Sequence, residues 1–124
     1  MTIVGLTATL AIFIAPLRGE DAKPDPTLRK HWFVTGRVQG VSFRAFTYES
    51  ATDLKLTGWV RNLTDGRVEI VAEGSEKAID QFLEKVKKGP PASRVGAVKE
   101  AKANEKEKLP DHFEIRDSAN PPAD

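Results

Sequence analysis

The sequence predicts one α+β domain, an antiparallel sheet with two helices on one face, and two observations support this prediction. Short segments rich in β-branched and aromatic residues are separated by two longer segments whose apolar residues recur at helical spacing. Their order is β-α-β-β-α-β, which is typical of a split βαβ, ferredoxin-like sandwich. A chain of 124 residues can bury one modest core, so we expect one folded domain.

The folded part is expected to begin with a strand and a helix. Residues 31–38 are mostly apolar, β-branched or aromatic, as in a strand. From Phe43 to Leu54, apolar residues recur close to helical spacing, which predicts the first helix.

A hairpin and a second helix follow. Residues 56–62 and 67–73 predict two strands joined by a short turn around Asp65-Gly66, a strong hairpin signal. The second helix is expected to begin after the N-cap residue Ser75 and to end at Gly89, with one apolar stripe between them that serves core packing.

Two strands complete the predicted domain. Residues 94–101 suit a fourth strand, and residues 113–116 suit a short terminal one. The segment 102–110 between them is charged, so we expect a solvated loop.

The turn between the first strand and the first helix has the features of an anion-binding site. It contains no proline, so each of its residues keeps a backbone N–H, and the helix dipole adds positive potential there. Gly40 allows the backbone to approach a ligand closely, and Arg44 in the first helical turn could bind phosphate oxygens in bidentate fashion. The candidate phosphate-binding residues are Gln39, Gly40, Val41, Ser42, Phe43 and Arg44.

Asn62 is expected to lie close to this turn. A strand-helix-strand crossover makes the first two strands parallel, so their C-terminal ends lie at the same rim of the sheet. The turn leaves the first strand at that rim, and Asn62 ends the second strand there. Its amide can both donate and accept hydrogen bonds. A turn-forming asparagine at a strand end is the alternative interpretation.

Two segments together resemble the acylphosphatase family. Residues 36–44 read Gly-Arg-Val-Gln-Gly-Val-Ser-Phe-Arg, and residues 58–68 read Gly-Trp-Val-Arg-Asn-Leu-Thr-Asp-Gly-Arg-Val. They match the family patterns G-x-V-Q-G-V-x-F-R and G-aromatic-V-x-N-x-x-x-G-x-V, in the same order. The similarity extends from about Lys30 to Ser118, and it implies the same ferredoxin-like fold.

The resemblance implies an enzyme that hydrolyses small acyl phosphates to a carboxylate and inorganic phosphate. By motif, Arg44 and the turn amides would hold the phosphoryl oxygens, and Asn62 would orient the attacking water. Phosphoryl transfer has a loose transition state, so positioning and charge stabilisation supply most of the catalysis. A site without cysteine, metal or clustered histidine can therefore work, and we expect no cofactor and a monomeric protein.

Other residues near the motifs have plainer interpretations. Ser42 has no His or Lys placed in sequence to activate it, so we reject it as a nucleophile. Arg37 and Arg61 could add positive potential at the rim, although solvated strand charges are the simpler interpretation. Trp59 is expected to pack over the sheet or a helix, although it could flank the substrate.

Composition excludes several classes of function. Nineteen basic and eighteen acidic residues leave a net charge of +1, which is no electrostatic footprint for nucleic acid. Without cysteine there is no disulfide, thiolate nucleophile or Cys-based metal site. His31 and His112 are too far apart in sequence for typical zinc-ligand spacing, and we expect ordinary strand-end residues.

A binding module of the same fold is the competing class. Ferredoxin-like RNA-binding domains stack bases on aromatic residues of central strands, but residues 67–73 contain no aromatic residue and two glutamates. A non-catalytic anion-binding or regulatory domain stays open as an alternative. So does a hydrogenase-maturation-type module acting on carbamoyl phosphate, although such modules normally precede cysteine-rich zinc segments.

The N-terminal segment is apolar but short. Residues 3–17 are nearly all apolar, fewer than the ~20 that span a bilayer, and no basic residues precede them. A cleaved export signal is favoured over a membrane-surface anchor, a misassigned start or a cytoplasmic protein. We therefore expect a signal-like segment and linker over 1–29, an acylphosphatase-like domain over 30–118 and a disordered tail over 119–124.

Overall fold

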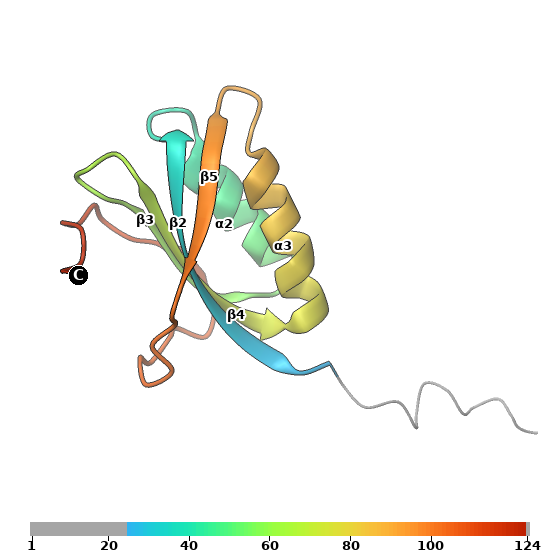
Figure 1. Ribbon diagram of the computed structural model, residues 1–124. Helices are drawn as coiled ribbons and strands as arrows, with labels where there is room; N and C mark the ends of the chain where they lie inside the picture. Colours follow the sequence, from blue (N-terminus) through green and yellow to red (C-terminus); the bar gives the residue numbers. More distant parts are fainter. Residues whose placement is uncertain (1–24, 124) are drawn as a thin grey trace, which may run out of the picture.

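The computed structural model describes residues 25–123, which form a five-stranded sheet with two helices on one face (Figure 1). This arrangement confirms the predicted ferredoxin-like α+β fold. The elements, in chain order, are β2 (Thr27–Arg37), α2 (Phe43–Asp53), β3 (Thr57–Asn62), β4 (Val68–Ser75), α3 (Glu76–Lys88), β5 (Arg94–Ala101) and β6 (Phe113–Ile115).

The sheet has the strand order β5-β2-β4-β3-β6, and one of its pairs is parallel. β2 and β3 both pair antiparallel with β4, and β5 pairs antiparallel with β2. β6 instead runs parallel to β3, so the expectation of a purely antiparallel sheet is wrong at this edge. The reason is the connection after β5, which crosses to the opposite edge of the sheet and returns the chain in the direction of β3.

The first strand begins earlier than predicted. β2 pairs with β4 from Thr27 opposite Ser75 onward, and the Pro26 carbonyl accepts a hydrogen bond from the Glu76 N–H. The expected linker therefore ends before residue 27, and the expected boundary at residue 30 falls inside a strand. The apolar segment 3–17 lies outside the described residues.

The core lies between the sheet and the helices. On β4 every second residue faces the helices: Val68, Ile70 and Ala72 are fully buried in the core. Ser75 caps α3 by accepting a hydrogen bond from the Ala78 N–H at 3.1 Å, and Phe82 of this helix packs in the core. Burying one such large apolar side chain stabilises the fold by about 1.5–3 kcal/mol. Core packing therefore fixes the position of α2 on the sheet, and with it the turn that joins the C-terminal end of β2 to α2.

The connection between β5 and β6 is at least partly exposed throughout residues 102–110, as expected for a solvated loop, but hydrogen bonds also attach it to the sheet. The Arg29 guanidinium donates hydrogen bonds to the carbonyls of Asn104 and Glu107, at 2.6 and 2.7 Å. The Trp59 indole N–H donates to the Glu107 carboxylate at 2.8 Å. Trp59 is thus buried on the sheet face opposite the helices, as a packing residue. The polar composition of the loop concealed these contacts.

Neither of the two described helices is long and apolar enough to cross a bilayer.

Candidate active site

The turn between β2 and α2 has a backbone shape that suits anion binding. Gly40 and Ser42 both have left-handed backbone conformations, with φ of 73° and 65°. Left-handed residues that alternate with right-handed ones in a turn direct neighbouring backbone N–H groups toward one point. Ser42 precedes α2 without capping it through its side chain, so the first helical N–H groups are not satisfied by that hydroxyl. The turn therefore presents free donors at the positive end of a helix dipole.

A pocket of about 230 Å³ opens beside this turn. The residues that line it come from the turn, the start of α2 and the ends of β3 and β6: Val38, Gly40, Ser42, Phe43, Arg44, Ala45, Asn62 and Ile115.

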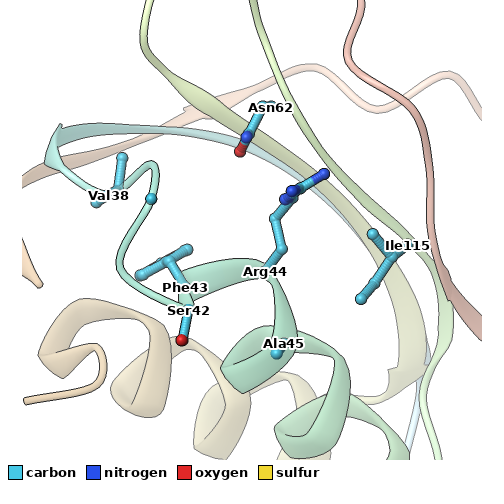
Figure 2. A pocket seen from close by; sticks show the side chains of 8 residues that line it. Val38, Ser42, Phe43, Arg44, Ala45, Asn62 and Ile115 are labelled. Carbon is cyan, nitrogen blue, oxygen red and sulfur yellow. The ribbon is translucent and has the colours of Figure 1, made fainter. Parts of the chain in front are cut away.

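Arg44 and Asn62 meet in this pocket although they lie on different elements. Arg44 is the second residue of α2, and Asn62 is the last residue of β3. Figure 2 shows the Arg44 side chain extending from α2 toward the level of Asn62, with Ile115 on its other side. β2 and β3 run in the same direction, because both pair antiparallel with β4. The prediction that Asn62 lies close to the turn before α2 is therefore confirmed.

The Asn62 amide has an unused acceptor. Its Oδ1 is buried and accepts no hydrogen bond from the residues that the structure describes. Almost all buried polar atoms in native proteins have a partner, so an unpaired one at a pocket suggests a role with a ligand or water.

Two of the predicted phosphate-binding residues do not line the pocket. Val41 packs against the hydrophobic core. The Gln39 side chain donates two hydrogen bonds, each of 2.8 Å, to the carbonyls of Leu63 and Arg67 in the β3–β4 turn. The side chain of Gln39 therefore links the anion-binding turn to the hairpin that carries Asn62, a contact that the sequence did not predict.

The Ser42 hydroxyl is directed away from the other polar groups of the site. Figure 2 shows its oxygen pointing away from Asn62 and from the Arg44 guanidinium, although Ser42 lines the pocket. This orientation agrees with the rejection of Ser42 as a nucleophile.

Sequence reasoning missed the residues that complete the apolar part of the pocket, above all Ile115. Its side chain is 45% exposed at the pocket, next to Arg44. It lies near this rim because β6 runs parallel to β3 and ends opposite Val60, two residues before the end of β3. Alternation from the buried Phe113 indicates that Ile115 faces the helix side of the sheet. Its position at this rim, however, depends on the parallel pairing of β6 with β3, which the sequence did not indicate.

The face of the sheet opposite the helices carries a buried ion-pair network. The Glu69 side chain accepts hydrogen bonds from Arg61 Nε at 2.8 Å and contacts His31 Nε2 at 2.7 Å. Arg61 is therefore paired with Glu69, in contrast to the expected solvated charge. His31 lies within β2, where a strand-end residue was expected. His112 is exposed, and the described residues contain no cluster of His, Cys, Asp and Glu that could hold a metal ion.

This network changes the titration of Glu69, which is 2% exposed. Burial raises the pKa of Glu69, but the hydrogen bonds with His31 and Arg61 and their charges outweigh it, so the pKa is lower than its ordinary value. A carboxyl whose pKa is lowered by folding stabilises the fold above its unfolded pKa, here about 4.5, and this contribution is lost as the pH falls further.

The comparisons identify the family. The acylphosphatase family model matches residues 30–115. The chain is 60% identical to an acylphosphatase from Syntrophotalea carbinolica over 65 residues, 52% of this chain and 71% of that protein. The fold and the family match thus define a hydrolase domain with a ferredoxin-like sheet. The chain belongs to the acylphosphatase family, whose enzymes hydrolyse the carboxyl-phosphate bond of small acyl phosphates.

Solved structures support the same conclusion. The acylphosphatase from Bacillus subtilis is 46% identical, with a TM-score of 0.61 over 71% of this chain and 97% of that one. Full-length HypF in a phosphate- and nucleotide-bound form has a TM-score of 0.69 at 31% identity, covering 83% of this chain but 13% of that one. The similarity to HypF is thus limited to a small part of a much larger protein.

The lowered pKa of Glu69 predicts how stability depends on pH. We expect Glu69→Gln to reduce the free energy of unfolding near neutral pH, because the Arg61 guanidinium and His31 lose their carboxylate partner. The unsubstituted protein should be more stable than the variant by an amount that shrinks as the pH falls below about 4.5. At low pH its Glu69 becomes protonated and loses the charge that Gln lacks at every pH. Urea unfolding of both proteins between about pH 6 and about pH 3 measures this difference in the free energy of unfolding.

Glu84→Gln, at an exposed position of α3, is the matched control and should have little effect at any pH. A deficit for Glu69→Gln that stays constant across the range would contradict the lowered pKa.

Proposed function

We propose that Arg44 and the N–H groups of the turn hold the phosphoryl group of a small acyl phosphate while Asn62 orients the attacking water. The water oxygen forms a bond to phosphorus as the bond from phosphorus to the acyl oxygen breaks. The products are a carboxylate and inorganic phosphate, and the proton of the water is released. The observation that carries this proposal is the convergence of Arg44, Asn62 and the turn on one small pocket.

The charges of the site suit this reaction. Negative charge on the phosphoryl oxygens is balanced by the Arg44 guanidinium, whose planar donors match two oxygens at once. Backbone N–H groups are already fixed by the turn and cost no reorganisation when charge develops. The leaving carboxylate is a weak base, so its departure requires no strong general acid.

The unpaired Oδ1 of Asn62 supports the role of the amide. At this place Oδ1 can accept a hydrogen bond from a water molecule, so that the lone pair of the water oxygen is directed toward phosphorus. Holding the nucleophile in a near-attack geometry reduces the entropic part of the barrier. Asn62 would therefore act mainly on turnover, whereas Arg44 would act on both binding and turnover.

Arg44 and Asn62 are predicted to have separable effects. Arg44→Ala should weaken competitive inhibition by inorganic phosphate and lower kcat, and Arg44→Lys should restore little, because a point charge cannot reproduce the planar fork. Asn62→Ala should leave phosphate inhibition nearly intact while kcat falls by about 10²-fold or more. Steady-state hydrolysis of acetyl and benzoyl phosphate, with phosphate as inhibitor, measures both.

If Asn62→Ala weakens phosphate inhibition as much as Arg44→Ala does, or keeps near-normal kcat, the water-orienting role is wrong. Unfolding curves of each variant control for loss of structure.

The reaction is also proposed to need no metal ion. Arg44 and the turn amides supply the positive potential that a cation provides in other phosphoryl-transfer sites. We expect protein treated with EDTA and then desalted to retain its kcat on acetyl phosphate. Loss of activity that a divalent ion restores would overturn this part of the proposal.

A further inference from the structure

The chain continues past the family match and returns to the end of β3. The acylphosphatase model matches residues 30–115, whereas residues 118–120 lie beyond it, and Ala119 and Asn120 among them form hydrogen bonds with Asn62 and Thr64. We infer that residues 118–120, here called the C-terminal segment, are a positioning element that fixes Asn62 for catalysis. This inference rests on the proposed water-orienting role of Asn62.

The C-terminal segment is joined to the end of β3 by two backbone hydrogen bonds and one side-chain hydrogen bond. The Ala119 N–H donates to the Asn62 carbonyl at 3.1 Å, and the Ala119 carbonyl accepts from the Thr64 N–H at 2.9 Å. Ala119 thereby forms a parallel bridge with Leu63. The Thr64 hydroxyl also donates to Asn120 Oδ1 at 3.2 Å. Ala119 and Asn120 are therefore paired, which corrects the expectation of a disordered tail from residue 119.

These bonds close an edge that β6 leaves open. β6 ends at Ile115, opposite Val60, so its ladder stops short of Asn62. On its other edge Asn62 pairs with Val68 of β4. With Ala119 in place, the backbone of Asn62 is held from both sides. Figure 1 shows the C-terminal segment beside the turn between β3 and β4.

The Asn62 side chain depends on this backbone support. Its Oδ1 accepts no hydrogen bond from the described residues, so none of them fixes the direction of that oxygen through a hydrogen bond. The direction then follows from the backbone and from packing. A displacement of about 1 Å in a catalytic group can cost up to about 10²-fold in rate. Loosening the strand end should therefore lower kcat without removing any group that binds phosphate.

Single substitutions in the full chain test the key hydrogen bond. Ala119→Pro removes the N–H that donates to Asn62, whereas Ala119→Gly keeps it and is the conservative control. We expect Ala119→Pro to lower kcat about tenfold, with phosphate inhibition unchanged, and Ala119→Gly to stay near the unsubstituted protein. Equal kcat for Ala119→Pro and Ala119→Gly, or a parallel loss of phosphate inhibition, would overturn the inference.

Two shortened chains provide an independent test. A chain ending after Asp117 lacks the C-terminal segment, and a chain ending after Asn120 keeps it. We expect the first to show the reduced kcat of Ala119→Pro and the second to be unchanged. Equal kcat for the two chains contradicts a positioning role.

Combination with Asn62→Ala separates positioning from general loss of structure. Removing the C-terminal segment should lower kcat only while Asn62 is present; an equal loss in the Asn62→Ala background would contradict the inference. If Asn62→Ala alone has normal kcat, the proposed function fails as well. If Asn62→Ala loses kcat while Ala119→Pro does not, the proposed function stands and this inference fails.

Discussion

Two hydrogen bonds from one side chain join the halves of the active site. Gln39 Nε2 donates to the carbonyls of Leu63 and Arg67, each at 2.8 Å. Gln39 belongs to the turn before α2, the proposed phosphate-binding turn, and the two carbonyls belong to the turn that follows Asn62. A partly buried amide with both protons satisfied fixes distance and orientation together. In the proposed mechanism the turn before α2 holds phosphate and Asn62 holds water. The distance between this turn and the end of β3, which Gln39 fixes, must therefore be maintained.

The sheet sets the frame on which this link acts. β2 and β3 are parallel because both pair with β4, so the turn and Asn62 reach the same rim. The parallel β6 adds Ile115 at that rim, and Ala119 extends the pairing to the end of the site. On the far face, Glu69 is held by Arg61, the residue before Asn62. Asn62 thus ends a strand that lies between a core face and an ion-paired face, each of which restrains it.

The sequence predicted what depends on local patterns and not what depends on long-range contacts. Ser75 and Gly89 marked the ends of α3 because capping is local, and parallel β2 and β3 followed from one crossover. The contacts of Gln39 and the pairing of Ala119 join residues distant in sequence, so no periodicity indicated them. Burial of Glu69 was not predicted for the same reason, since its partners His31 and Arg61 lie on the neighbouring strands.

A double-mutant cycle between Gln39 and Asn62 tests the central claim most directly. Gln39→Ala keeps the backbone N–H of the turn but removes both bonds to the hairpin, and Gln81→Ala on the exposed side of α3 is the control. We expect Gln39→Ala to lower kcat about tenfold in the unsubstituted protein and far less in the Asn62→Ala background, because the link acts by placing Asn62. The same fold-change in both backgrounds would show that Gln39 does not position Asn62, and would contradict the account.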